Sequence, residues 1–341
     1  MLVARLHAAG DIRTTTEPVP SPAEGEQLVR VTAVGICGSD LHWYAEAGIG
    51  DARLGEPLVV GHEAAGVIVG GAADGRRVAI DPAVPCGACE FCLAGHRNLC
   101  PGVGFLGHGG TDGAMRQYLT WPGHLLHPLP DSLGDAGGAM LEPLGVAVHA
   151  HDLGHQRLAS TVAVIGCGPI GLLLVQLARA AGATLVVAAD PLPHRAEAAR
   201  RYGADAVLPT GPGAFAAALA DLTSGRGADV VHEAAGTGPA VALAFGAARP
   251  GGRVVLTGIP DDDRTAFGAA TARRKGLTIA VVRRMKEVYP RAIALVERGL
   301  VDVETLVTHT FGLEDTGRAF STAHAREGLK VVVEPQRGPA S

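Results

Sequence analysis

The sequence has no excess of positive charge and no hydrophobic run long enough to cross a membrane. Its formal net charge is -5, and only 18% of its residues are charged. Nucleic acids and anionic membrane surfaces attract clustered positive charge, so the composition argues against both as partners. The most apolar stretch, residues 171–190, is interrupted by Gln176, Arg179 and Gly182, and the N-terminus lacks a sustained apolar segment. We therefore expect a cytoplasmic protein that acts on a small molecule.

The chain is too long for one hydrophobic core, since it has 341 residues, of which 47% are hydrophobic. Short β-rich runs separated by Gly, Pro and Asp predict an irregular β domain over residues 1–148. From Thr161 onward, strand-like and helix-like segments alternate, which predicts an α/β domain with a doubly wound parallel sheet over residues 149–284. The tail, residues 285–341, is too small for its own core and is expected to return to the first domain. The later strand candidates are Asp205–Leu208, Asp229–His232, Arg253–Thr257 and Thr278–Val282.

Four of the six cysteines form one group, in the spacing C-x2-C-x2-C-x7-C. They are Cys86, Cys89, Cys92 and Cys100. This spacing lets four thiolates enclose one tetrahedral zinc ion, and such a closed site has no position for a substrate. The sequence therefore predicts a structural zinc that holds the lobe of residues 86–100. The alternative is four separate or disulfide-bonded cysteines, a pattern more typical of secreted chains.

A glycine motif of the type G-x-G-x-x-G follows an apolar strand and opens a helix. It consists of Gly166, Cys167, Gly168, Pro169, Ile170 and Gly171. This context is typical of dinucleotide binding, because the glycines allow pyrophosphate to approach the helix N-terminus. Asp190 ends the next strand, where it can accept hydrogen bonds from ribose hydroxyls and repel a 2′-phosphate, so NAD is favoured over NADP. Arg195 could accommodate a phosphate, which leaves NADP open as the cofactor. The alternative to a dinucleotide site is that the glycines form an ordinary strand-to-helix turn.

A second, open metal site is suggested by Cys37, His62 and Glu63. They offer a thiolate, an imidazole and a carboxylate, a mixed set that leaves room for water or an alcohol. On their own these three residues are weak evidence, since a single cysteine or a Gly-His-Glu sequence is common in proteins without a metal.

The order of these motifs resembles that of a known family. The segment Gly35-Ile36-Cys37-Gly38-Ser39-Asp40, then Gly61-His62-Glu63, the cysteine lobe and the glycine motif are similar to those of the zinc-containing medium-chain alcohol dehydrogenases. The segment HWYAEAGIGDARLGEPLVVGHE is most similar to the sorbitol (polyol) dehydrogenase branch and its L-idonate and xylitol relatives. The resemblance spans essentially the whole chain. It implies a GroES-like catalytic domain, a Rossmann domain and two zinc ions per chain.

The resemblance also implies roles for individual residues. Cys37, His62 and Glu63 match ligands of a catalytic zinc, and Glu142 lies beside the metal in that branch, binding it directly or through water. A zinc ion makes a bound alcohol more acidic, and nicotinamide accepts the hydride. Ser39 and His42 match a proton relay from the substrate, through the nicotinamide ribose, to solvent.

Further matches are looser. The expected contacts to the nicotinamide half of NAD are Thr257, Gly258, Ile259, Val282, Arg283 and Arg284. The expected substrate contacts are Ser39, Trp43, Glu142 and Arg284. This chain departs from the branch at Trp43-Tyr44, where Tyr then Trp is usual, and at Met285, where Tyr is usual. We assign no role to the remaining histidines, His108 and His124 among them.

These features together predict a dehydrogenase that oxidises a secondary alcohol of a polyol or sugar acid with NAD+. The alternative is L-threonine 3-dehydrogenase or 2,3-butanediol dehydrogenase, which would use the same zinc and relay. Ser39 leans against threonine, because threonine dehydrogenases commonly have Thr there. Family members commonly form a homodimer or homotetramer, and the residues do not decide between them.

Overall fold

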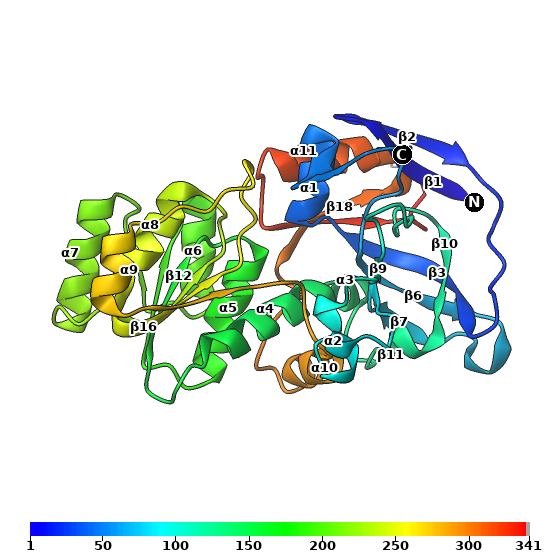
Figure 1. Cartoon of the computed structure of the whole chain (residues 1–341). Coiled ribbons are helices and arrows are strands. Elements are labelled where there is room, and N and C mark those ends of the chain that lie inside the picture. The colour runs from blue at the N-terminus through cyan, green and yellow to red at the C-terminus, as the bar shows by residue number, and fades with distance from the viewer. Residues whose placement is uncertain (339–341) are drawn as a thin grey trace. The chain divides into compact units, whose positions relative to one another are not determined.

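Residues 1–338 form two compact units in a computed structural model of the chain (Figure 1). Unit 1 holds Met1–Pro143, Lys286–Arg298 and the chain from Asp302; unit 2 holds Leu144–Met285 and Gly299–Val301. The last three residues of the predicted segment 285–341 lie outside the described residues. Within residues 1–338, no helix combines the length and the apolar character that a membrane span needs.

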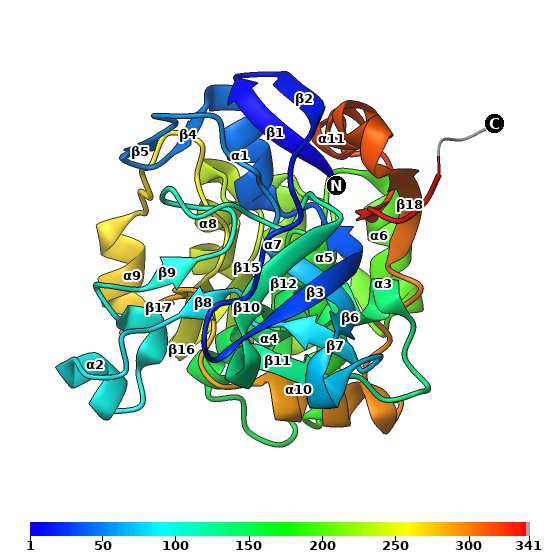
Figure 2. The same ribbon diagram turned by 90° about the vertical axis from the view of Figure 1, so that its right-hand side faces the viewer.

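A seven-stranded sheet forms the frame of unit 1 (Figure 2). Its strands run in the order β11-β7-β6-β3-β19-β18, and β10 also pairs with β3. All neighbours are antiparallel except β18 and β19, which are parallel. The strands are β3 Glu26–Gly35, β6 Glu63–Val69, β7 Arg77–Ile80, β10 Tyr118–Pro122, β11 Leu126–Pro128, β18 Val307–Gly312 and β19 Lys330–Glu334.

The sequence of β3 explains its central place in this sheet. Val29 and Val31 are fully buried, and the residues beside them in the chain are partly exposed, as expected where successive side chains point to opposite faces. An irregularity in the pairing with β6 falls between Val31 and Ala33. As a result Val34 joins Val29 and Val31 in the main core, whereas Ala33 packs in a separate cluster with Ala139, the last residue of α3 (Asp135–Ala139).

Unit 1 takes strands from both ends of the chain. In β19, Val332 pairs with Gly35 of β3, and the hydroxyl of Tyr289 donates a hydrogen bond to the carbonyl of Ile80 at 2.9 Å. The other elements of unit 1 are β1 Leu2–Ala8, β2 Asp11–Thr16, α1 Gly38–Glu46, β4 Gly48–Ile49, β5 Ala52–Arg53, η1 Gly71–Ala73, β8 Ala83–Val84, α2 Glu90–Leu93, η2 Arg97–Leu99, β9 Gly104–Phe105, η3 Gly123–Leu125, α3 Asp135–Ala139, α10 Tyr289–Glu297, η4 Leu313–Asp315 and α11 Thr316–His324. Helix α4 Leu141–Gly154 continues the chain from unit 1 into unit 2.

Unit 2 is built on six parallel strands in the order β14-β13-β12-β15-β16-β17. This order reverses direction at β12, so the predicted doubly wound parallel sheet is confirmed. The strands are β12 Thr161–Ile165, β13 Leu185–Ala189, β14 Ala206–Val207, β15 Ala228–Glu233, β16 Ala248–Leu256 and β17 Thr278–Val281. The helices are α5 Pro169–Ala180, α6 Pro193–Arg201, α7 Pro212–Thr223, α8 Gly238–Ala247 and α9 Ala269–Lys275.

Strand β16 begins earlier than the predicted strand Arg253–Thr257. Ala248 already pairs with Ala228 of β15, and the pairing then shifts register before Arg253. The intervening Pro-Gly-Gly looks like a turn in the sequence, but it forms an irregularity within one strand.

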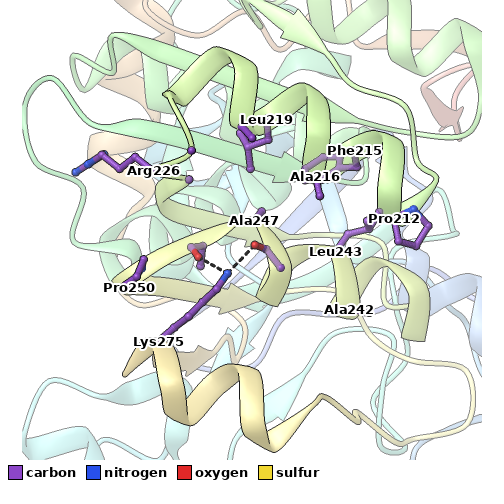
Figure 3. A pocket seen from close by; sticks show the side chains of 15 residues that line it. Pro212, Phe215, Ala216, Leu219, Arg226, Ala242, Leu243, Ala247, Pro250 and Lys275 are labelled. Atoms are coloured by element: carbon purple, nitrogen blue, oxygen red, sulfur yellow. Dashed lines mark hydrogen bonds between the residues drawn. The ribbon is translucent and has the colours of Figure 1, made fainter.

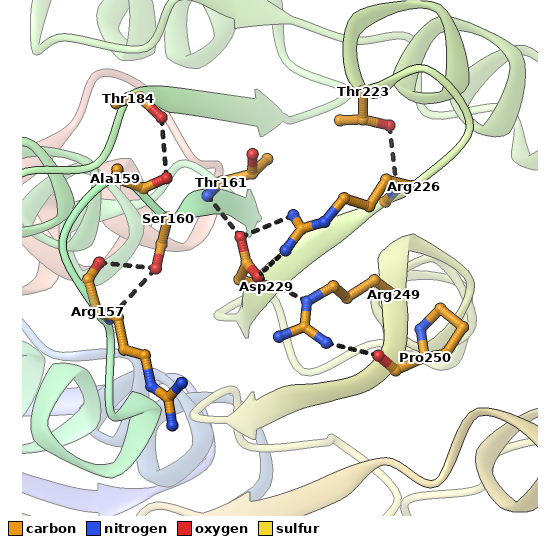
Figure 4. Close-up of polar contacts among 11 residues, drawn as sticks. Arg157, Ala159, Ser160, Thr161, Thr184, Thr223, Arg226, Asp229, Arg249 and Pro250 are labelled. Atoms are coloured by element: carbon orange, nitrogen blue, oxygen red, sulfur yellow. Dashed lines mark hydrogen bonds and ion pairs between the residues drawn. The ribbon is translucent and has the colours of Figure 1, made fainter.

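Asp229 ties three segments together at the start of β15 (Figure 4). Its carboxylate accepts hydrogen bonds from Arg226 at 2.6 Å, from Arg249 at 2.6 Å and from the amide of Thr161 at 2.9 Å. Burial opposes the charge, but the two guanidinium groups and the amide lower the pKa of Asp229 overall. This arrangement fixes the amino ends of β12, β15 and β16 relative to one another.

A hollow of about 380 Å³ lies against α7 and α8 (Figure 3). Phe215 and Leu219 contribute apolar lining, and Lys275 donates from its rim to the carbonyls of Gly246 and Ala248, each at 2.7 Å. None of the residues that the sequence predicts for the site lines this hollow.

Candidate functional site

Cys37, His62 and Glu63 come together where two strands of unit 1 meet. Cys37 follows the end of β3, Glu63 begins β6, and Gly35 lies opposite Glu63 in the antiparallel register. One ligand atom from each of the three side chains lies within 4.8 Å of the others. Catalytic zinc sites take three such protein ligands and keep the fourth position for water or substrate. The donor set therefore fits the catalytic zinc that the sequence predicts.

The buried carboxylate of Asp40 orients His62. Asp40 Oδ1 lies 3.4 Å from His62 Nδ1, and Oδ2 accepts a hydrogen bond from the amide of Cys37 at 2.9 Å. Burial raises the pKa of Asp40, but His62 and the backbone amides outweigh burial and lower it overall. Because Nδ1 faces a carboxylate, Nε2 is the nitrogen left for a metal.

Lys330 neutralises the carboxylate of Glu63. The two side chains form an ion pair, and they are only 3% and 1% exposed. Burial lowers the pKa of Lys330, but the charges of Glu63 and Cys37 outweigh burial and raise it. Gly35 lies beside this pair, and a Cβ there would overlap the Glu63 carboxylate and lie 2.9 Å from Lys330 Cε. A glycine at the end of β3 therefore makes room for the ion pair.

Glu142 interacts electrostatically with His62 and Glu63 but is not one of the three clustered metal-ligand candidates. It stands in the first turn of α4 and is 4% exposed. Burial raises its pKa to about 7, and the charges of His62, Glu63 and Lys330 also act on it. The group of ligand atoms that lie within 4.8 Å of one another does not include Glu142. Direct binding of the metal by Glu142 stays a prediction.

Helix α1 carries the residues predicted for the proton relay. Ser39 and His42 are partly exposed, and their separation of three positions places them on one face of the helix. Trp43, predicted as a substrate contact, is only 3% exposed, and its indole nitrogen donates a hydrogen bond to His108 Nδ1 at 3.2 Å. The relay and the substrate contact stay predictions.

The four-cysteine lobe lies between β8 and β9, and all four sulfur atoms are within 4.8 Å of one another. Each of the six cysteines, all within the described residues, is unbridged. Hydrogen bonds from backbone amides lower the pKa of Cys86 to about 6, whereas burial and the neighbouring thiols raise the pKa of Cys92 to about 12. Arg97 of this lobe forms an ion pair with Asp81, which is 2% exposed and follows β7. The donor set fits the predicted structural zinc, and the ion pair holds the lobe to the sheet.

The predicted dinucleotide turn connects β12 to α5. Gly166 has a φ of 94°, a left-handed conformation that favours glycine, and α5 begins at Pro169. The carboxylate of Asp190 accepts hydrogen bonds from the amides of Cys167 at 2.7 Å and Leu192 at 2.8 Å. The acid that is predicted to bind ribose is thus held directly beside the turn. The guanidinium of Arg195 is also close, since a Cβ at Gly168 would lie 3.6 Å from it.

The remaining predicted cofactor residues lie at the same edge of this parallel sheet. Thr257 follows β16, and its amide donates to the carbonyl of Glu233 at 2.8 Å. The amide of Val282 follows β17 and donates to the carbonyl of Leu256 at 2.9 Å. The carboxyl ends of parallel strands are where doubly wound folds bind ligands. The predicted residues at this edge are Gly166, Gly168, Pro169, Ile170, Gly171, Asp190, Arg195, Thr257, Gly258, Ile259, Val282, Arg283 and Arg284.

Two family models match the chain. The model of the alcohol dehydrogenase GroES-like domain matches residues 23–131, and the model of the zinc-binding dehydrogenase matches residues 169–298. The sorbitol dehydrogenase of Bacillus subtilis (strain 168) is 37% identical over 345 residues, which cover 99% of this chain and 98% of the relative. The chain belongs to the zinc-dependent medium-chain alcohol dehydrogenases.

Solved structures give the same result for this dehydrogenase. An Escherichia coli oxidoreductase of unknown specificity superposes with a TM-score of 0.91 at 31% identity, covering 98% of both chains. The L-idonate 5-dehydrogenase of Escherichia coli superposes with a TM-score of 0.90 at 26% identity, covering 98% of this chain and 97% of that one. The GroES-like and Rossmann fold expected from the sequence is confirmed, and the protein is an oxidoreductase.

Two residues of the dehydrogenase's metal site were missed by the sequence analysis. Asp40 belongs to the motif around Cys37, and an acid three positions after a metal ligand is a recognisable signal for an orienting carboxylate. Lys330 gives a weaker signal, as a charged residue that precedes the three valines of β19. Its pairing with Glu63 depends on the contact of β19 with β3, which the sequence alone does not reveal.

Proposed function

We propose that this dehydrogenase transfers a hydride from a secondary hydroxyl of a polyol or sugar acid to NAD+, giving a ketose or keto acid. The convergence of Cys37, His62 and Glu63 on one point carries this proposal. The buried acid Glu142 adds to it, because the simple alcohol dehydrogenases commonly have a cysteine in that region. The names of two relatives, a sorbitol dehydrogenase and an L-idonate 5-dehydrogenase, support the same substrate class.

The proposed mechanism assigns a task to each residue of the metal site. Zinc held by Cys37, His62 and Glu63 would make the substrate hydroxyl more acidic. Asp40 keeps the ring of His62 in one orientation, and the Lys330 ammonium compensates the buried charge of Glu63.

Protons are handled by other side chains. Because burial raises its pKa to about 7, Glu142 can accept or release a proton near neutral pH. Ser39 and His42 pass the substrate proton to solvent, and their shared, partly exposed face on α1 supports this relay.

NAD rather than NADP is the proposed cofactor, and its nicotinamide ring, when bound, would accept the hydride. Asp190 supports this choice, because a carboxylate held beside the glycine turn accepts hydrogen bonds from ribose hydroxyls and repels a 2′-phosphate. Arg195 lies close to the same turn, so discrimination against NADP is expected to be incomplete.

The test is the initial rate of NAD+ and NADP+ reduction, followed optically, with zinc-loaded protein and one substrate panel. The panel holds sorbitol, xylitol, galactitol, inositols, L-idonate, threonine and 2,3-butanediol. Turnover of a polyol or sugar acid with NAD+ supports the proposal. Activity with threonine or the diol alone would move the protein to the alternative function, and no activity on any of them would show that the substrate class is wrong.

A further inference from the structure

We infer that Glu233 is a positioning residue for the cofactor, which fixes the distance between the two segments predicted to bind the two halves of NAD. One is the glycine turn, residues 166–171, and the other is the nicotinamide segment, residues 257–259. The inference rests on the proposed function, because it needs NAD as the cofactor. The sequence predicts no role for Glu233, and its carboxylate belongs to neither group of candidate metal ligands.

Glu233 ends β15, the strand that lies between β12 and β16. It stands opposite Ile165 of β12 on one side and opposite Leu256 of β16 on the other. The glycine turn directly follows Ile165, and the nicotinamide segment directly follows Leu256. In such sheets the ligand binds at the carboxyl ends of the strands, where the strand order reverses. Glu233 therefore lies between the two predicted halves of the cofactor site.

The carboxylate of Glu233 holds the turn that follows it, residues 234–236, which we call the Glu233 turn. Oε1 accepts hydrogen bonds from the amides of Ala235 at 2.8 Å and Gly236 at 2.7 Å. Burial raises the pKa of Glu233, although these two amides and that of Gly258 act to lower it. The side chain is only 1% exposed, so these amides rather than water solvate its charge. The carboxylate thus interacts both with its own turn and with the nicotinamide segment.

The main chain around Glu233 connects the same elements. The carbonyl of Glu233 accepts hydrogen bonds from the amides of Thr257 at 2.8 Å and Gly258 at 3.2 Å. On the other side, the amide of Ala234 donates to the carbonyl of Ile165 at 2.8 Å, directly before the glycine turn. The Glu233 turn is therefore bonded to both neighbouring strand ends.

The Glu233 turn also fits tightly between its two neighbours. A Cβ at Gly166 would lie 2.9 Å from both the nitrogen and the Cβ of Ala235. A Cβ at Gly258 would overlap the nitrogen of Gly236, and a Cβ at Gly236 would overlap the carbonyl oxygen of Ile259. Gly236 has a φ of 71°, a left-handed conformation that favours glycine. Because there is no spare room on either side, a shift of the Glu233 turn would displace the glycine turn or the nicotinamide segment.

This arrangement distinguishes the whole cofactor from its adenosine half. NAD would contact the glycine turn and the nicotinamide segment at once, so its affinity depends on how well the distance between them is fixed in advance. ADP would reach only the glycine turn and Asp190, which are bonded to each other independently of Glu233. Releasing the Glu233 turn should therefore weaken the binding of the dinucleotide more than the binding of ADP.

The experiment measures the affinities of NADH and ADP by isothermal titration calorimetry, for the zinc-loaded wild type and three variants. Glu233→Ala removes the carboxylate, whereas Glu233→Gln keeps one acceptor for the amides of Ala235 and Gly236. The matched control is Asp229→Asn, which removes the charge that pairs with two arginines at the opposite end of β15 (Figure 4). The thermal midpoint gives the loss of stability in each variant, and ADP binding shows that unit 2 is folded.

The deciding quantity is the ratio of the Kd for NADH to the Kd for ADP. We expect it to rise about tenfold in Glu233→Ala, the effect of one lost hydrogen bond to a charged group, and to rise less in Glu233→Gln. In Asp229→Asn the thermal midpoint should fall while the ratio keeps its wild-type value.

An unchanged ratio in Glu233→Ala, whether both affinities fall together or neither falls, would overturn the inference and leave the proposed function intact. An equal rise in Glu233→Gln or in Asp229→Asn would assign the effect to a general loosening of unit 2 and would overturn the inference as well. A wild type that binds no NADH would overturn both the inference and the proposed cofactor.

Discussion

The histidine His232 should make unit 2 sensitive to acid. It lies in β15, is fully buried, and neither of its ring nitrogens has a hydrogen-bond partner among the described residues. Burial, together with repulsion from His151, lowers its pKa to about 3. The ring of His151 in α4 is stacked 6.3 Å away. Replacing His232 with Leu removes the titrating group and fills its place in the core with an apolar side chain.

The size of the effect follows from the two pKa values. In the unfolded chain a histidine has a pKa of about 6.5. In the folded chain the pKa of His232 is lowered to about 3. The contribution of the neutral, buried imidazole to the free energy of unfolding is therefore fully present above pH 6.5 and is lost as the pH falls toward 3. Between pH 7 and pH 5 the wild type should lose about 2 kcal/mol more than His232→Leu.

The assay must report on unit 2 alone, because the chain has two units and is not expected to unfold in one step. Both tryptophans, Trp43 and Trp121, lie in unit 1, so fluorescence would miss the effect. Hydrogen exchange of the β12 and β15 amides in urea, at pH 7 and pH 5, gives the free energy of unfolding of the unit 2 sheet. If wild type and variant lost the same stability over this range, the reasoning about a neutral buried histidine would be refuted. His124→Leu, an exposed histidine in unit 1, serves as the control.

Three other predictions concern the metal sites and the cofactor. In protein freed of zinc by a chelator, Lys330→Met should lower the free energy of unfolding of unit 1 by about 3–5 kcal/mol, because it leaves the charge of Glu63 buried without a partner. Urea unfolding followed by tryptophan fluorescence measures the loss, and a loss below about 1 kcal/mol would contradict the prediction. Cys100→Ser should reduce bound zinc from about two ions to one per chain and make residues 86–100 susceptible to protease. Metal analysis and limited digestion measure these two effects, and an unchanged zinc content would speak against a structural site. Asp190→Ala should raise the KM for NAD+ about tenfold and that for NADP+ much less, whereas equal changes in initial-rate kinetics would argue against ribose recognition.

Much of unit 2 could be predicted from the sequence, because local patterns determine it. The apolar strand before Gly166, the helix that begins at Pro169 and the acid at Asp190 follow one another within a short stretch. Strand β16 was predicted too short because Pro250, Gly251 and Gly252 resemble a turn, and only the pairing with β15 shows that the strand continues through them.

Contacts between distant segments could not be predicted in the same way. Lys330 and Glu63 meet only because β19 and β6 both lie beside β3 in one sheet. The link between His108 and Trp43 depends on a loop packed on Gly61, and nothing in the spacing of the histidines reveals it. Ligand residue types can be read from a sequence, but the residues that orient and neutralise them require the fold.

The central claim is that Cys37 helps to hold the zinc ion that activates the substrate. The most direct test is the rate of NAD+ reduction by Cys37→Ala with the best polyol, measured on protein that still binds NAD+ and keeps its structural zinc. We predict that one zinc ion per chain is lost and that turnover falls below detection, because the donor set keeps only His62 and Glu63. A variant that oxidises the polyol at a rate close to that of the wild type would contradict the assignment of this site.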